Sequence, residues 1–399
     1  LSHQSVVLCS FGDASLNHST TQGTLNAAEW IVAHHLPMPL IFICEDNGIG
    51  ISVPTQLDWV KKTIQDRPGI VYLDCDGLNF CDVFEKAHLA KQIALKQKKP
   101  VFLHMKTVRL LGHAGSDIEM QYRTPKEIIK TEDDDPLLHT ARILYENKIL
   151  SAEELLSQYE KTRALIEKLS ERAVQEPKLS SKTEVMQSIV PPKSTHASKP
   201  LVQSAKVKMP CTLAQGINWA LDELMQRYPE IIVFGEDVGK KGGVYRVTQG
   251  LQQKYGPKRV FDTLLDEQTI LGTAIGSALN GLLPIAEIQF LAYIHNAVDQ
   301  VRGEAATLSF FSSGQYTNPM VIRIQGLAYQ KGFGGHFHND NSIGFLREIP
   351  GVIVACPAHG QDAAKLLKDT AYLQKSIGTI TKKTNFKKPS GLILISCYF

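Results

Sequence analysis

The stretch VVLCSFGDASLNHSTTQGTLNAAEWIVAHHLPMPLIFICEDNGIG, residues 6–50, decides the fold. It opens with an apolar run, Val6–Cys9, that predicts a buried strand near the centre of a sheet. Helical composition follows at Thr20–His34, and a second apolar run, Leu40–Cys44, predicts the next strand. Strands that alternate with helices indicate a parallel sheet whose ligands bind at the carboxyl ends of the strands.

Two loops in this stretch place polar side chains where the predicted strands end. Gly12-Asp13 follows the first strand, and the loop after the second strand contains Asn47 and Ile49. Because parallel strands end at one edge of a sheet, we expect Asp13 and Asn47 to lie close together. Mg2+ prefers oxygen ligands and shares them with phosphates, and glycines let a main-chain carbonyl, here that of Ile49, come near. Each dipeptide taken alone is also a common turn signal.

Composition limits the classes of protein to which the chain can belong. Its 399 residues exceed one typical core and predict two domains with a connector. The net charge is only +3 and there is no basic run, so we expect no nucleic-acid partner. The seven cysteines are scattered without a CxxC pair, which favours a reducing, cytoplasmic setting. Polar residues and a proline interrupt the most apolar stretch, Ala274–Ile294, so we expect no membrane span.

A second α/β pattern follows the first after a change of composition. Charged helical sequence gives way to a Pro-, Ser- and Lys-rich linker at Glu176–Lys208, and strands and helices alternate again from Thr212. We therefore predict an α/β protein with two parallel sheets, each flanked by helices. The expected parts are a first domain at 1–130, a helical extension and linker at 131–208, a second domain at 209–375 and an atypical tail at 376–399.

Three further segments carry specific expectations. Helical composition at His295–Leu308 predicts one continuous helix. The last stretch, Gly378–Phe399, is rich in lysine and then abruptly apolar, so we expect a truncation or a shifted reading frame rather than the end of a domain. The early strand at Val6–Cys9 leads us to expect that sequence has been lost ahead of it.

The motifs also resemble those of a known family. Gly12-Asp13-Ala14, followed by Asn47, is similar to the thiamine diphosphate motif, which runs from Gly-Asp to a terminal Asn. The run Leu111–Asp117 looks like the active-site loop in the α part of 2-oxo acid dehydrogenases. These enzymes are the thiamine-dependent first components of the pyruvate and branched-chain complexes.

Later segments resemble the β part of the same enzymes. The likeness covers about 5–130 and 209–373, in the order α then β, as in single-chain versions. It implies two thiamine diphosphate-binding-fold domains. The segments that carry the β-part likeness are 235–239, 243–245, 261–263, 284–290 and 334–338.

The resemblance assigns roles to individual residues. Glu267 corresponds to the carboxylate that contacts the aminopyrimidine ring of the cofactor, and His338 to a histidine that handles protons during decarboxylation and acyl transfer. His113 matches a catalytic-loop histidine near the cofactor phosphates, and Phe290 matches an aromatic residue near the aminopyrimidine. The implied cofactor-binding residues are Gly12, Asp13, Ala14, Asn47, Ile49, His113, Glu267 and Phe290, and the implied Mg2+ ligands are Asp13, Asn47 and Ile49.

Each of these residues also has a simpler interpretation. Glu267 can belong to an acidic helix start, His113 can be a solvated loop residue, and Phe290 can be ordinary core. His336 and His338 form an HxH pair of the kind that binds transition metals, although no third ligand follows at a recognisable spacing.

The resemblance implies oxidative decarboxylation of a 2-oxo acid, either a branched-chain acid or pyruvate. The acyl group would pass to the lipoyl group of a partner dihydrolipoyl acyltransferase, and we expect a homo-oligomer because the family builds its site between domains of different halves. One alternative is ketol transfer of the transketolase type. Another is an inactive remnant, because we expect the chain to lack diphosphate-contacting sequence ahead of the Gly-Asp motif and a further α/β domain after the β part.

Overall fold

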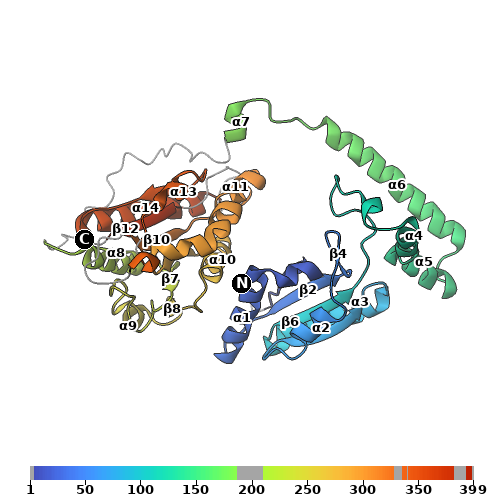
Figure 1. The fold of residues 1–399 in the computed structure, drawn as a ribbon, viewed down its shortest axis with the longest axis horizontal. Coiled ribbons are helices and arrows are strands. Elements are labelled where there is room, and N and C mark those ends of the chain that lie inside the picture. The colour runs from blue at the N-terminus through green and yellow to red at the C-terminus, as the bar shows by residue number, and fades with distance from the viewer. Residues whose placement is uncertain (1–3, 187–209, 328–334, 339, 382–391, 398–399) are drawn as a thin grey trace. The chain divides into compact units, whose positions relative to one another are not determined.

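Two compact units make up the chain (Figure 1). Unit 1 comprises residues 1–178 and unit 2 comprises residues 179–399, so the division falls inside the expected linker at 176–208. Most of that linker lies outside the described residues. None of the described helices combines the length and the apolar character needed to cross a lipid bilayer. The computed structural model describes residues 4–186, 210–327, 335–338, 340–381 and 392–397.

Unit 1 is built on a parallel sheet. Among the described residues, four strands pair in the order β1-β2-β6-β5. The register pairs Gly12 with Glu45 and Asp46 with Lys106, so the strands end at a common edge. A small antiparallel hairpin follows β2 at that edge. The strands are β1 (Val7–Gly12), β2 (Leu40–Asp46), β3 (Ile49–Gly50), β4 (Val53–Pro54), β5 (Val71–Asp76) and β6 (Val101–Lys106).

Helices cover both faces of this sheet and bury an apolar cluster on each. Alternate residues of a strand point to opposite faces, and in β2 the side chain of Phe42 lies in one cluster while that of Ile41 lies in the other. The Phe42 cluster includes residues of η1, α1 and α2, and the Ile41 cluster includes residues of α3. These helices are η1 (Asp13–Asn17, a 3₁₀ helix), α1 (Ser19–Ala33), α2 (Trp59–Ile64) and α3 (Phe80–Gln97).

The first strand lies elsewhere in the sheet than its sequence indicates. The apolar run at Val6–Cys9 predicts a buried central strand, but β1 pairs only with β2 and forms an edge of the described sheet. Its side chains at Val7 and Leu8 are 49% and 65% exposed. The prediction of a central position was wrong because apolar character specifies a strand but not its neighbours.

The helical extension of unit 1 forms as its sequence indicates. Capping boxes start two of its helices: Thr124 pairs with Glu127 at the start of α4, and Ser151 with Glu154 at the start of α6. None of the described residues of α6 is buried. The helices are η2 (Glu119–Gln121), α4 (Pro125–Asp133), α5 (Pro136–Glu146) and α6 (Ala152–Gln175), and α7 (Lys182–Met186) follows in unit 2.

Unit 2 is built on a larger parallel sheet. Its described strands pair in the order β11-β12-β10-β9-β7-β8. Alternate residues of β7 enter two apolar clusters, with Ile231 and Val233 in one and Ile232 and Phe234 in the other. The strands are β7 (Ile231–Gly235), β8 (Val260–Asp262), β9 (Leu283–Ile288), β10 (Val321–Gly326), β11 (Ile353–Ala355) and β12 (Leu392–Cys397).

Helices pack on both faces of this second sheet. Residues of α8 and α14 belong to one cluster, and residues of α10, η3 and η4 belong to the other. The helices are α8 (Leu213–Arg227), α9 (Leu251–Tyr255), α10 (Glu267–Leu279), η3 (Leu291–Ala297, 3₁₀), η4 (Gln300–Ala305, π), α11 (Leu308–Phe311), α12 (Gly335–His338), α13 (Ile343–Arg347) and α14 (Gly360–Thr381).

Two segments of unit 2 differ from the sequence-based expectation. The helix expected at His295–Leu308 is replaced by three short pieces, η3, η4 and α11. In η3, the buried residues Leu291, Ile294 and Ala297 recur every three positions, which suits a 3₁₀ helix better than an α-helix. The stretch expected as a tail at 376–399 includes the end of α14 and strand β12, which pairs with β10 and β11.

Candidate functional site

Asp13 and Asn47 come together at the carboxyl edge of the unit 1 sheet. Asp13 is the first residue after β1 and its side chain is 1% exposed. Its carboxylate accepts a hydrogen bond from the Thr55 hydroxyl at 2.7 Å and further hydrogen bonds from the backbone N–H groups of Ala14 and Asn47. The Asn47 side-chain oxygen accepts a hydrogen bond from the Ile49 N–H at 3.1 Å. The prediction that Asp13 and Asn47 lie close together is therefore confirmed.

The loop after β2 approaches the start of η1 very closely. A Cβ atom added at Gly50 would stand 2.8 Å from the Cβ of Ala14, so only glycine fits there against that alanine. Gly48 adopts a φ of +75°, in the left-handed region that favours glycine. Gly50 and Gly48 therefore allow the loop to lie against η1.

The donor atoms at this edge fit a magnesium ion. Asp13 offers a carboxylate, Asn47 an amide oxygen and Ile49 a main-chain carbonyl, all hard oxygen donors of the kind that Mg2+ prefers. Burial raises the pKa of Asp13, and the neighbouring charge of Asp46 raises it further, while the hydrogen bond from Thr55 lowers it. A bound cation would offset the negative charge that Asp13 and Asp46 concentrate here.

A buried histidine lies behind the loop, and sequence reasoning did not single it out. His104 is 1% exposed, and its Nε2 lies 2.8 Å from Oδ2 of Asp46. Its Nδ1 lies 2.6 Å from the hydroxyl of Tyr72. The hydrogen bond with His104 is the largest influence on Asp46 and lowers the pKa of that carboxyl group. The only sequence signal was a histidine inside the apolar run Val101–Met105, which we interpreted as strand alone.

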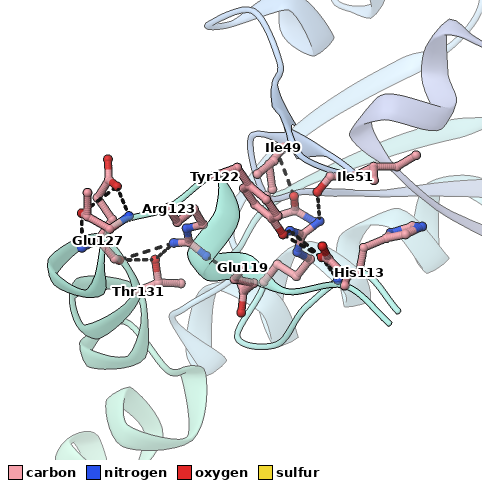
Figure 2. A network of polar contacts seen from close by, with 12 residues as sticks. Ile49, Ile51, His113, Glu119, Tyr122, Arg123, Glu127 and Thr131 are labelled. Atoms are coloured by element: carbon pink, nitrogen blue, oxygen red, sulfur yellow. Dashed lines mark hydrogen bonds and ion pairs between the residues drawn. The ribbon is translucent and has the colours of Figure 1, made fainter. Parts of the chain in front are cut away.

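A hydrogen-bond network fastens the His113 loop to the loop after β2 (Figure 2). Arg109 donates to the carbonyl of Ile51 at 2.7 Å and to the Tyr122 hydroxyl at 2.8 Å. The same hydroxyl donates to Asp117 at 2.7 Å, and the backbone N–H of His113 donates to Asp117 at 2.7 Å. His113 itself is exposed, and the structure fixes its backbone rather than its ring.

Arg123 extends this network into the helical extension (Figure 2). Its guanidinium forms an ion pair with Glu119 at 2.8 Å and donates to the hydroxyl of Thr131 in α4. The carbonyl of Glu127 accepts a longer hydrogen bond from the same group at 3.4 Å. The loop that carries His113 is therefore anchored at both ends, by Arg109 and by Arg123.

Glu267 in unit 2 is a buried carboxylate at the first position of α10. Its side chain is 7% exposed, and one oxygen accepts a hydrogen bond from the Asn296 amide at 2.9 Å. A second carboxylate, Glu236, follows β7 and has a pKa raised to about 7 by burial and then by the charge of Glu267. Tyr293 lies in the same electrostatic neighbourhood, since both glutamates act on its raised pKa after the effect of burial. In the sequence, Glu236 stands at the end of a predicted strand within the segment 235–239, but the resemblance assigned it no role.

Phe290 and His338 meet in an aromatic cluster of unit 2. Their ring centroids lie 5.0 Å apart in an edge-to-face arrangement, and Phe290 is 4% exposed. Tyr293 contacts both rings, at 5.6 Å from Phe290 and 5.9 Å from His338. The described residues contain no group of three or more His, Cys, Asp or Glu side chains placed to hold a metal, and the His336 side chain lies outside the description.

Comparisons with known proteins match each half of the chain to one family model. Residues 2–182 match the dehydrogenase E1 component, and residues 210–388 match the pyrimidine binding domain of transketolase.

Several curated proteins are similar to part of the chain. The E1 component subunit beta of pyruvate dehydrogenase from Acholeplasma laidlawii is 45% identical over 157 residues, which is 39% of this chain and 47% of that protein. The 2-oxoisovalerate dehydrogenase subunit beta from Pseudomonas aeruginosa is 37% identical over 175 residues, 43% of this chain and 49% of that protein. The chain thus spans about half the length of the curated relatives it matches. The chain therefore contains a dehydrogenase E1 component domain followed by a transketolase pyrimidine-binding domain, and part of it is similar to the beta subunits of pyruvate and 2-oxoisovalerate dehydrogenases.

Proposed function

We propose that the chain binds thiamine diphosphate with Mg2+ and catalyses the oxidative decarboxylation of a 2-oxo acid. The observation that carries this proposal is the placement of Asp13 beside Asn47 at the carboxyl edge of a sheet, within a domain that matches the dehydrogenase E1 component. A buried carboxylate and an amide oxygen one loop away suit a metal that shares its oxygen ligands with phosphates.

Unit 1 supplies the metal-binding residues in this proposal. Asp13, Asn47 and the carbonyl of Ile49 would hold Mg2+, and Gly12 and Ala14 would leave room for the diphosphate beside them. The His113 loop would close over the phosphates, with its backbone held by Asp117. Because Asp13 is buried with a raised pKa, binding a cation at this carboxylate is favourable in electrostatic terms.

Unit 2 supplies the residues that would act on the ring and on the substrate. When bound, thiamine diphosphate provides the carbon centre that accepts electrons as the carboxyl group of the substrate leaves. Glu267 would hold a proton against the aminopyrimidine, and Phe290 would pack against that ring. His338, placed by its contacts with Phe290 and Tyr293, would move protons during decarboxylation and acyl transfer.

The relatives guide the proposed substrate and partner. Their names point to pyruvate and 2-oxoisovalerate as substrates of those proteins, so we propose pyruvate or a branched-chain 2-oxo acid for this chain. The acceptor would be the lipoyl group of a dihydrolipoyl acyltransferase, whose disulfide takes up two electrons while one sulfur receives the acyl group. We further propose that the protein is a cytoplasmic homo-oligomer.

A turnover assay tests this function. The full chain with thiamine diphosphate and Mg2+ is given a panel of 2-oxo acids and an artificial two-electron acceptor, and released CO2 is measured. We expect turnover of pyruvate or a branched-chain acid, and a loss of at least about 100-fold in Glu267→Gln, because proton-handling groups contribute that much to rate. Glu348→Gln removes an exposed carboxylate of unit 2 and should leave turnover unchanged.

Two outcomes would contradict the proposal. A chain that binds the cofactor but releases no CO2 from any 2-oxo acid would not be a dehydrogenase component. Ketol transfer from a ketose phosphate donor in place of decarboxylation would assign the chain to transketolase chemistry.

A further inference from the structure

The two carboxylate oxygens of Asp46 form hydrogen bonds with different elements, one with the loop after β2 and the other with strand β6. Asp46 is the last residue of β2, and its Oδ1 accepts a hydrogen bond from the Gly48 N–H at 3.1 Å. Its other oxygen, Oδ2, lies 2.8 Å from Nε2 of His104 on β6. Asp46 therefore connects the loop that contains Asn47 and Ile49 to a strand in the interior of the sheet.

His104 is buried, and both of its ring nitrogens have a hydrogen-bond partner. It is 1% exposed on β6, which lies between β2 and β5, and its second ring nitrogen faces the Tyr72 hydroxyl at 2.6 Å. An ionised carboxylate only accepts hydrogen bonds, so Nε2 of His104 carries the proton that it shares with Asp46. The Tyr72 hydroxyl then donates to Nδ1, so both ring nitrogens of His104 have a hydrogen-bond partner.

The loop contains a glycine, Gly48, so its backbone can adopt many conformations unless other residues hold it in place. Gly48 has a φ of +75°, and a glycine gives the chain more conformations than other residues do. On its other side the loop is tied to Asp13 through Thr55, whose N–H donates to the Gly48 carbonyl at 2.9 Å and whose hydroxyl donates to Asp13 at 2.7 Å. The loop is thus held from two directions, by Thr55 and by Asp46.

We propose that His104, supported by Tyr72, is a positioning residue for the metal loop, acting through Asp46 to hold Gly48 and so to place Asn47 and the Ile49 carbonyl. The part of this inference that concerns Mg2+ rests on the proposed function. The part that concerns the loop is a property of the protein without any ligand. Residues that orient metal ligands from behind commonly change metal affinity by about 10- to 100-fold when they are replaced.

Two side-chain replacements at position 104 separate positioning from simple packing. His104→Leu keeps the volume but removes both hydrogen bonds, whereas His104→Gln keeps an N–H donor that can reach Asp46. The matched control is Arg67→Met, which removes hydrogen bonds to Gln22, Asn26 and Glu29 elsewhere in unit 1. All variants are made in the full chain.

The first readout is amide hydrogen exchange at Gly48 in the ligand-free protein. We expect exchange to accelerate by about tenfold or more in His104→Leu, because the N–H loses a fixed acceptor, and to change by less than about threefold in His104→Gln and Arg67→Met. The second readout is the Mg2+ concentration that half-saturates thiamine diphosphate binding, followed by calorimetry. We expect it to rise by about tenfold or more in His104→Leu alone.

The outcomes distinguish this inference from the proposed function. Unchanged Gly48 exchange and unchanged Mg2+ dependence in a folded His104→Leu protein would overturn the inference. If the parent chain binds no thiamine diphosphate, the proposed function fails, and Gly48 exchange still decides whether His104 holds the loop. Should His104→Leu not fold, Tyr72→Phe serves in its place: faster Gly48 exchange supports the inference, and parental exchange overturns it.

Discussion

Two neighbouring carboxylates of unit 1, Asp13 and Asp46, have opposite electrostatic surroundings. Asp13 is buried and has a raised pKa, whereas its neighbour Asp46 has a lowered pKa because His104 donates to it. Glu236 in unit 2 resembles Asp13, since burial and the charge of Glu267 raise its pKa to about 7. A raised pKa marks a carboxylate whose ionised form lacks compensation in the free protein, and such groups cluster at functional sites.

The pH dependence of stability should reveal Glu236. Its pKa is about 7 in the folded chain against an ordinary value of 4.5, so the folded state holds the proton more tightly than the unfolded state. Stability from this group is fully present below pH 4.5 and is lost as the pH rises to about 7. Glu236→Gln should remove this loss and raise the free energy of unfolding at pH 8 by about 2 kcal/mol relative to the parent, with little change at pH 4. Urea denaturation at both pH values measures it, and an equal effect at pH 4 and pH 8 would contradict the assignment.

The close contact between Gly50 and Ala14 leads to a second prediction, which concerns stability. Gly50→Ala places a Cβ atom 2.8 Å from that of Ala14, so the loop must move, and we expect a loss of about 1 to 3 kcal/mol in unfolding free energy. Ala14→Gly combined with Gly50→Ala removes the clash and should recover part of that loss. Denaturation of the three variants forms a double-mutant cycle. If the changes in unfolding free energy were additive, Gly50→Ala and Ala14 would not clash, and the prediction would be contradicted.

At the scale of elements, side-chain hydrogen bonds order the loop from Arg109 to Arg123, whose regular structure is limited to the short 3₁₀ helix η2. Arg109 connects it to Ile51 and to Tyr122, and Asp117 accepts from both Tyr122 and the His113 backbone. Loops that carry function are commonly held on a rigid scaffold in this way. The loop is therefore joined by hydrogen bonds to the loop after β2, and Figure 2 shows the labelled Ile51, Tyr122 and His113 within this network.

Removing the Arg109 side chain should loosen this loop. In Arg109→Met, the Ile51 carbonyl and the Tyr122 hydroxyl lose their donor, so Tyr122 and Asp117 are free to shift. We expect hydrogen exchange at the His113 N–H to accelerate by about tenfold. Arg142→Met, at an exposed position of α5, is the matched control and should leave it unchanged. Parental exchange at His113 in Arg109→Met would show that the network does not order the loop.

Sequence patterns predicted where strands and helices occur along the chain better than they predicted the position of a strand within its sheet. The alternation of strands and helices indicated two parallel sheets, and both are present. The apolar run at Val6–Cys9 identified a strand but could not show that it lies at an edge, because pairing partners are distant in sequence. The segment His295–Leu308 has helical composition, but packing against the unit 2 core favours a three-residue repeat in η3.

At the scale of the whole molecule, each unit has its own sheet and its own pair of apolar clusters. Unit 1 carries Asp13 and Asn47 at a strand edge, and unit 2 carries Glu267, Phe290 and His338. Asp13 and Asn47 were predictable because each follows a strand and adjoins a glycine. The network behind them was not predictable, because Tyr72, His104 and Asp46 come from three strands whose order only the fold reveals. The same holds for the effect of the Glu267 charge on the pKa of Glu236.

We propose that Asp13 and Asn47 belong to a magnesium-dependent thiamine diphosphate site. The most direct measurement is a calorimetric titration of the full chain with thiamine diphosphate, with and without Mg2+, for the parent, for Asp13→Ala and for Asp66→Ala. Asp66 is an exposed carboxylate of unit 1 and serves as the matched control. We predict saturable, Mg2+-dependent binding by the parent and by Asp66→Ala, and none by a folded Asp13→Ala protein. Equal binding by Asp13→Ala and the parent, or no binding by a folded parent chain, would contradict the account.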